Sequence, residues 1–161
     1  MLRRPSAELD VLAVGLLTGA MLVIAVVLVP YWAALPADQF RGWFVANAHR
    51  VRALTYPLAA AAVVLSVAAS ALEEPGSRAR SRLWVAAGAV AAVLAITIFV
   101  NEGLSARFAA GALPDADRAR LLTTWVAWHW ARVGLGVIAF VASIRAVGMV
   151  TPTRPSPPSG L

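Results

Sequence analysis

The sequence contains neither cysteine nor lysine. Without cysteine, disulfides, zinc–thiolate sites and iron–sulfur clusters are all excluded, which removes several classes of enzyme. The 14 basic residues are therefore all arginines, and the net charge of +6 is spread along the chain without a block of like charge. Because a nucleic-acid partner requires a clustered basic face, we expect no nucleic-acid partner.

Charged residues of either sign are also scarce. They make up 14% of the chain, whereas 60% is hydrophobic and the mean hydropathy is +0.75. Such a composition is too apolar for a water-soluble domain of this size. The sequence predicts an integral membrane protein, with the lipid bilayer as its first partner.

Four apolar runs come close to or exceed the roughly 20 residues that cross a bilayer. They cover residues 11–35, 53–72, 83–100 and 121–150. The first run, preceded by Arg3 and Arg4, also resembles a secretory signal peptide, but it is longer than the usual core of about 7 to 15 residues. Short connections favour an all-α, four-helix up-down bundle as one domain, residues 1–150. The Pro/Ser-rich tail, residues 151–161, is expected to be disordered.

The connections carry recognisable turn and helix-start residues. Pro75 and Gly76 mark a turn between the second and third spans. Asp38, and Asp115 or Asp117, each follow a proline and are placed to cap the next helix.

The distribution of arginines predicts a membrane orientation only if the arginines expected inside the bundle are left out of the count. Seven lie on each side of the expected bundle. If Arg50, Arg52 and Arg132 are held inside it, the side of the termini has the excess. The positive-inside rule then places both termini in the cytoplasm, and we expect a bacterial plasma membrane.

Polar residues gather where the first and third spans end and the second and fourth begin, which is one face of an up-down bundle. The other end has only its loop charges. Trp125, Trp128, His129 and Arg132 are spaced i, i+3, i+4 and i+7, which predicts one stripe on the fourth helix. The gathered polar residues are Asn47, His49, Arg50, Arg52, Asn101, Glu102, His129 and Arg132.

The second span offers a face of mostly small residues, which allow close helix approach in membranes. This face includes Gly42, Ala46, His49 and Tyr56. We therefore expect His49 to face into the bundle, with Tyr56 two turns deeper.

Ionisable groups at membrane depth are costly and by default indicate a functional site. The first hypothesis is a Trp-walled cavity for a small lipophilic, aromatic substrate. His129 would act as general base, while Arg132 and Asn101 stabilise negative charge on an oxygen. The expected substrate-binding residues are Trp125, Trp128, His49, Arg52, Tyr56 and Glu102.

Other interpretations stay open. His49 and His129 on facing helices could ligate haem, with arginines pairing the propionates. A metal site that uses Glu102 is weaker, because no H-x-x-x-H or E-x-x-H spacing occurs, and we predict no metal. The cluster could also only anchor the helices of a non-catalytic structural or partner module. A pore would require a homo-oligomer, which the sequence permits.

Two stretches, "FVNEGLSARF" and "RARLLTTWVAWHWARVGLGVIAF", resemble the anthrone oxygenase-like family, small four-helix membrane proteins whose bacterial members mostly have no assigned activity. The resemblance spans about residues 10 to 150 and includes the W-x-x-W-H-W-x-R stretch. An Asn-x-x-Asn-like pattern is usual in the family, and here only Asn101 matches it. The resemblance implies an oxidoreductase that converts an anthrone to an anthraquinone with molecular oxygen and without a cofactor. The residues it would use are Asn101, Trp125, His129 and Arg132.

Overall fold

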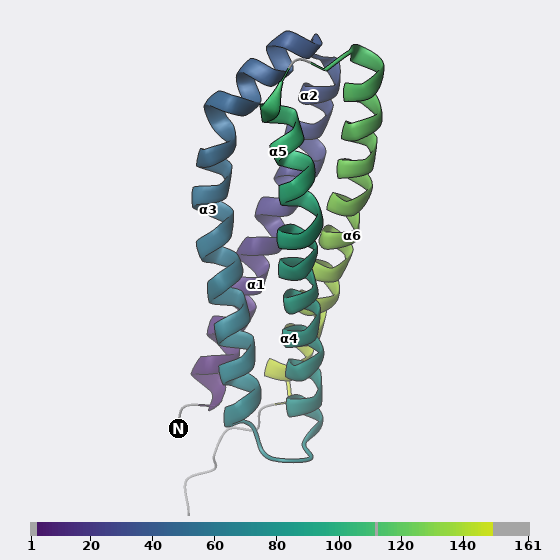
Figure 1. Ribbon diagram of the computed structural model, residues 1–161. Coiled ribbons are helices and arrows are strands. Elements are labelled where there is room, and N and C mark those ends of the chain that lie inside the picture. Colours follow the sequence, from purple (N-terminus) through teal and green to yellow (C-terminus); the bar gives the residue numbers. More distant parts are fainter. Residues whose placement is uncertain (1–2, 112, 150–161) are drawn as a thin grey trace, which may run out of the picture.

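The structure, a computed structural model, describes residues 3–111 and 113–149. Within these ranges, four helical segments are long and apolar enough to cross a membrane: Arg4–Ala34, Ala37–Leu72, Arg78–Ala110 and Asp115–Val147. Figure 1 shows them side by side in up-and-down order, with the N-terminal helix beginning and the last helix finishing at the same end. The predicted all-α, integral membrane four-helix bundle is confirmed. The tail predicted to be disordered lies outside the described residues.

Two of the four segments contain a π-helical turn. The first segment consists of α1 (Arg3–Val23), the π turn η1 (Ile24–Leu28) and α2 (Val29–Ala34), and the second is the single helix α3 (Ala37–Leu72). The third consists of α4 (Arg78–Ile96), the π turn η2 (Thr97–Asn101) and α5 (Glu102–Ala110), and the fourth is α6 (Asp115–Val147). Such π turns are rare in proteins as a whole, but those that do occur are often at functional sites.

The helices are longer than the apolar runs. α3 begins at Ala37, well before the apolar run that starts at residue 53. Its first turns are amphipathic, since Phe40 and Phe44 are buried while Arg41 and Arg50 are exposed. Mean hydropathy detects only the uniformly apolar part of a helix, so the apolar run begins later than the helix itself.

The predicted aspartate caps are wrong. Pro36 and Pro114 occupy the N-cap positions of α3 and α6, and neither helix has a side-chain cap. Asp38 and Asp115 lie in the first turns instead, where a negative charge interacts favourably with the helix dipole. The side-chain cap belongs to α4, where Ser77 Oγ accepts from the Arg80 backbone N–H.

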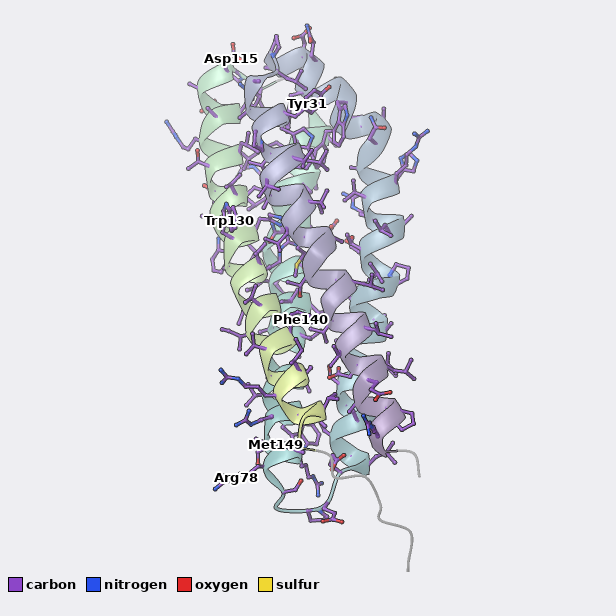
Figure 2. All side chains as sticks on the ribbon, turned by 180° about the vertical axis from the view of Figure 1, so that it is seen from behind. Tyr31, Arg78, Asp115, Trp130, Phe140 and Met149 are labelled. Atoms are coloured by element: carbon purple, nitrogen blue, oxygen red, sulfur yellow. The ribbon has the colours of Figure 1, made fainter. Side chains whose placement is uncertain are left out.

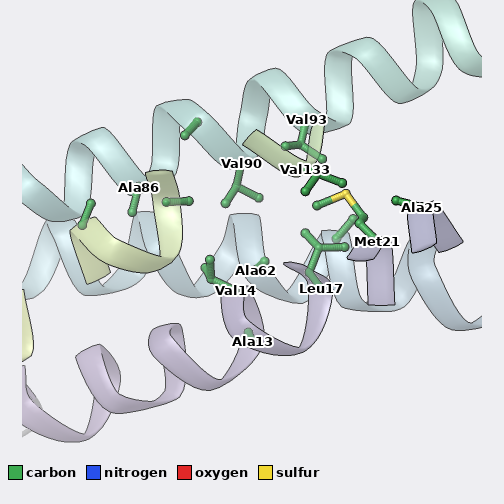
Figure 3. Close-up of a cluster of buried hydrophobic side chains, with 14 residues drawn as sticks. Ala13, Val14, Leu17, Met21, Ala25, Ala62, Ala86, Val90, Val93 and Val133 are labelled. Atoms are coloured by element: carbon green, nitrogen blue, oxygen red, sulfur yellow. The ribbon is translucent and has the colours of Figure 1, made fainter. Parts of the chain in front are cut away.

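The centre of the bundle is packed mostly with small and branched apolar side chains, such as Ala62 and Val133, together with Met21 (Figure 3). Close helix approach explains this choice of residues. A Cβ added at Gly136 of α6 would lie 2.8 Å from Thr18 Oγ1 and 2.9 Å from Met21 Cε. α6 therefore contacts α1 through a position where no side chain fits without movement.

A buried carboxylate lies near the end that carries the termini. Asp10 of α1 is fully buried and accepts hydrogen bonds from Ser66 Oγ (2.5 Å) and Ser143 Oγ (2.6 Å). These hydroxyls come from α3 and α6, so one side chain joins three helices. The prediction that this end has only loop charges is wrong, because Asp10, which directly precedes the first apolar run, lies inside the bundle.

Candidate functional site

A cavity of about 90 Å³ lies between the helices in the half of the bundle away from the termini. Apolar residues of α1 and α4 form its floor, and polar and aromatic side chains from all four segments surround the rest. These polar and aromatic lining residues are Trp32, Phe44, Arg52, Thr55, Tyr56, Thr97, Asn101, Glu102, Ser105, Trp125, His129 and Arg132.

His129 is fully buried beside this cavity, and both of its ring nitrogens are engaged. Nε2 lies 3.0 Å from the Met21 carbonyl oxygen, and Nδ1 lies 2.6 Å from Arg132 Nη2. A carbonyl can only accept and a guanidinium can only donate, which assigns the neutral tautomer with hydrogen on Nε2. The imidazole also stacks on Trp125, with ring centroids 4.8 Å apart. His129 is therefore fixed in position, with its remaining lone pair directed at Arg132.

Arg132 is a buried cation whose side-chain hydrogen bonds go to neutral groups. It is 8% exposed, and Nη1 donates to Thr97 Oγ1 at 3.0 Å. With the amide of Asn101 oriented to accept, its oxygen lies 3.2 Å from Arg132 Nη2 and 3.3 Å from Trp125 Nε1. Among the described residues no carboxylate oxygen lies within 4.0 Å of this guanidinium. Because a buried charge without a counter-ion is costly, this arrangement needs an explanation.

The π turns supply several of the groups around the cation. Thr97 and Asn101 are the first and last residues of η2. Met21, whose carbonyl bonds His129, lies just before η1. A π turn shifts the helix register by one residue and so changes which side chains face inward. Here it turns two polar residues of an otherwise apolar span toward Arg132.

The mouth of the cavity lies between α3 and the segment formed by η2 and α5. Its partly exposed polar residues are Arg52 and Tyr56 of α3 and Glu102 of α5. Arg52 Nε lies 3.3 Å from Glu102 Oε2, so these two side chains form an ion pair across the mouth. The lining residues of α1, α2 and α6, by contrast, are buried or nearly so.

Aromatic rings close the cavity on the side away from the termini. Trp32 of α2 is 2% exposed, and its ring centroid lies 5.5 Å from that of Trp125. Phe40, Phe44 and Phe108 pack in the same cluster. Sequence reasoning did not include Trp32, because a tryptophan near the end of a span is also typical of an interfacial aromatic belt. It also missed Thr97 and Ser105, which look like ordinary helix residues.

Seven of the predicted site residues come together at this cavity. They are Arg52, Tyr56, Asn101, Glu102, Trp125, His129 and Arg132. Glu102 pairs with Arg52 and not with Arg132. Trp128 is 41% exposed and lies off the cavity. Trp130 is also exposed and points away from the bundle (Figure 2).

The predicted orientation of the second helix is wrong. His49 is exposed, as are Gly42 and Ala46 from the face of small residues. The inward face instead carries Phe44 and Arg52. Bulky aromatic packing, and not small-residue contact, sets the rotation of α3 at this end.

The two histidines do not fit haem ligation. His49 is exposed and is not among the residues that line the cavity. Both His129 nitrogens already have partners in the protein. The described residues also contain no group of three or more histidine or carboxylate side chains that could hold a metal ion.

A comparison with protein families identifies the relationship of this chain. The model described as anthrone oxygenase matches residues 43–142, more than half of the 161 residues. The chain belongs to the anthrone oxygenase family. No curated protein and no solved structure matches it.

The family match covers most of the cavity but not all of it. In this anthrone oxygenase family member, Asn101, Trp125, His129 and Arg132 lie inside the matched range. Met21 and Trp32 lie before it. α1 and α2 therefore add cavity residues that the family match does not include.

Proposed function

We propose that this protein oxidises an enolisable aromatic ketone of the anthrone class with molecular oxygen, in the cavity beside Arg132. The observation that carries the proposal is the buried guanidinium without a carboxylate partner among the described residues. A fixed positive charge in a dry site stabilises negative charge that develops on a substrate oxygen. The printed family description supports the substrate class.

The proposed proton acceptor is Glu102, which replaces His129 in the role predicted from the sequence. The lone pair of His129 Nδ1 already accepts from Arg132, so it is not free to take a proton from a substrate. Glu102 contributes the carboxylate among the described residues that line the cavity, and it lies at the mouth. His129 becomes a positioning residue that, with Thr97, fixes the plane of the Arg132 guanidinium.

The proposed reaction balances with oxygen as the co-substrate. Glu102 takes a proton from the ring methylene, and the electron pair moves onto the carbonyl oxygen next to Arg132. The ring carbon then transfers its electrons to dioxygen, a C–O bond forms, and the proton returns to give a hydroperoxide. Loss of water from this carbon leaves a second carbonyl. The sum converts a methylene and O₂ into a carbonyl and water, and the proposal uses no metal or cofactor.

The size of the cavity determines how such a substrate would lie. At about 90 Å³, it is smaller than the cavity of about 150 Å³ that holds a benzene ring. We therefore place the oxygen-bearing edge of the substrate inside and the remaining rings in the mouth, with Arg52 and Glu102 displaced. Arg52 and Glu102 are 37% and 36% exposed, so both side chains lie at the outer end of the mouth.

The proposal is tested by oxygen uptake and anthraquinone formation with 1,8-dihydroxyanthrone, above the rate of spontaneous oxidation. We expect Glu102→Gln to lower kcat by about 100-fold or more, the usual contribution of a general base. Glu8→Gln, at an exposed carboxylate far from the cavity, is the matched control and should keep the wild-type rate. The proposal fails if the wild-type protein is no faster than Glu102→Gln.

Chelation separates this proposal from a metal-dependent one. Since the proposed steps need only protein groups and oxygen, dialysis against EDTA should leave the rate unchanged. A rate that falls with EDTA and returns with an added metal would contradict the proposal.

A further inference from the structure

We propose that the cavity binds its ligand as an oxygen anion held by Trp32 Nε1 and Arg132 Nε, so that it selects aromatic enolates and phenolates over aromatic hydrocarbons. This inference rests on the proposed function and adds to it the substrate form and a binding residue, Trp32, outside the range of the family match.

The first observation is a pair of hydrogen-bond donors without partners. In the described part of the chain, four buried side-chain polar atoms lack a hydrogen-bond partner: Trp32 Nε1, Glu73 Oε1, Arg118 Nε and Arg132 Nε. Buried donors in proteins nearly always have one, and an exception commonly marks a missing water or ligand. Two of the four belong to residues that line this cavity, and both are donors.

The second observation is that these two residues lie against the same ring. The Trp32 centroid is 5.5 Å from that of Trp125 in an edge-on arrangement, and the Arg132 guanidinium carbon lies 5.6 Å from the Trp125 ring. An aromatic ligand entering here would meet ring faces and edges together with two N–H groups. In the proposed complex, both N–H groups donate to the ligand oxygen.

The third observation is the charge around the cavity. Arg52 and Glu102 neutralise each other across the mouth, and His129 is the neutral tautomer assigned above. Among the described residues no carboxylate forms a direct ion pair with Arg132, and Glu102, which interacts with its charge from a greater distance, is already paired with Arg52. An anionic oxygen supplies both the missing charge and the missing acceptor, whereas a neutral ether or ketone supplies only the acceptor.

The test uses anthracene-9-carboxylate as a stable aromatic oxygen anion, with the protein in lipid nanodiscs and partition into empty nanodiscs subtracted. Trp32→Phe keeps an aromatic ring but removes the donor, and we expect its Kd to rise by about fivefold to tenfold, as for one lost hydrogen bond. Trp43→Phe is the matched control, because Trp43 contacts Trp32 without lining the cavity, and its Kd should not change. Anthracene, which has no oxygen, should bind both variants equally.

Two outcomes overturn the inference. One is an unchanged Kd for anthracene-9-carboxylate in Trp32→Phe. The other is equal affinity of the wild-type protein for the carboxylate and its methyl ester, a comparison that does not depend on any variant folding. Competition by dodecanoate distinguishes a site for aromatic anions from a site for fatty acids. Weak competition with anthracene-9-carboxylate supports the aromatic site. Competition as strong as that of the aromatic acid contradicts the inference in favour of a fatty-acid site.

Failure of the proposed function gives a different pattern. Binding of the carboxylate that depends on Trp32, without oxidation of the anthrone, would leave the anion site intact and remove the oxygenase reaction. Oxidation of the anthrone that persists unchanged in Trp32→Phe would leave the oxygenase reaction intact and remove the anion site.

Discussion

Arg132 and His129 are held by each other, and this changes the role expected of the histidine. Nδ1 of His129 accepts from the guanidinium and Nε2 donates to the Met21 carbonyl. The imidazole thus ties α6 to α1 while it orients the cation. We propose that it acts through Arg132 and not on the substrate itself.

A rescue experiment distinguishes positioning from base catalysis. His129→Ala should lower kcat/KM for the anthrone by about tenfold or more, because Arg132 loses one of its fixed acceptors. His129→Gln should recover much of that loss, since an amide oxygen can accept from Arg132 but cannot take up a proton. Steady-state kinetics of both variants tests this. Equal losses in the two variants would restore the general-base role of His129.

Two tryptophans of α6, Trp125 and Trp128, differ in whether they line the cavity. Trp125 Nε1 donates to Ser105 Oγ at 3.2 Å, and its ring packs against His129. Trp125→Phe should therefore raise the KM for the anthrone and lower kcat, whereas Trp128→Phe, at a 41% exposed position, should leave both unchanged. An equal effect of the two substitutions would show that the cavity is not the place of reaction.

Helical spacing predicted part of this site correctly and failed where two residues are close to the edge of a stripe. Trp125, His129 and Arg132 are inward, as the i, i+4, i+7 spacing requires. Trp128 belongs to the same predicted stripe but is exposed, because only the positions of Trp125, His129 and Arg132 face inward on this part of α6. His49 was misplaced because small residues and aromatic residues compete to define the inward face of α3, and spacing alone does not decide between them.

The π turns and the buried Asp10 are features of the helices that hydropathy does not reveal. η1 and η2 both border the cavity, yet a register shift of one residue leaves the composition of a span unchanged. Neither hydropathy nor helical spacing therefore locates these π turns. Asp10 could have been found, since a carboxylate one residue before an apolar run can extend the helix inward by a turn.

Asp10 should be a strong determinant of stability. Asp10→Leu removes the acceptor of both Ser66 and Ser143 and should lower the free energy of unfolding by about 1–3 kcal/mol, the range for hydrogen bonds between membrane helices and for buried unpaired groups. Asp10→Asn keeps one acceptor oxygen and should cost less. Thermal unfolding in mild detergent measures both, with Glu8→Gln as the exposed control. A melting temperature unchanged by Asp10→Leu would contradict this role.

The close approach of α1 and α6 at Gly136 can be tested by substitution. Gly136→Ala would place a methyl group against Thr18 and Met21, and Met21 also bonds His129. We expect lower thermal stability and lower turnover together. Gly134→Ala, where nothing lies within 4 Å of the added atom, should change neither. Identical behaviour of the two variants would mean that the contact is not tight.

The whole molecule is the part that the sequence predicted best. Four apolar runs with short connections leave a bilayer-spanning bundle as the simple solution, and every backbone polar group is then satisfied within its own helix. The cavity depends on finer features: the rotation of α3, two π turns, and aromatic packing around Trp32. These arise from contacts between helices far apart in the sequence, so no single span contains the information.

The arrangement as a whole places Arg132, a buried cation without a direct carboxylate partner among the described residues, in a cavity that opens between α3 and η2. The most direct measurement is the rate of anthraquinone formation from 1,8-dihydroxyanthrone by Arg132→Gln compared with Arg145→Gln, an exposed arginine on the same helix. Loss of the positive charge should lower the rate by about 100-fold or more, as for removal of an oxyanion-stabilising group, whereas Arg145→Gln keeps the wild-type rate. If both folded variants oxidise the anthrone as fast as the wild-type protein, Arg132 does not stabilise the reaction, and the account of this cavity as the active site is wrong.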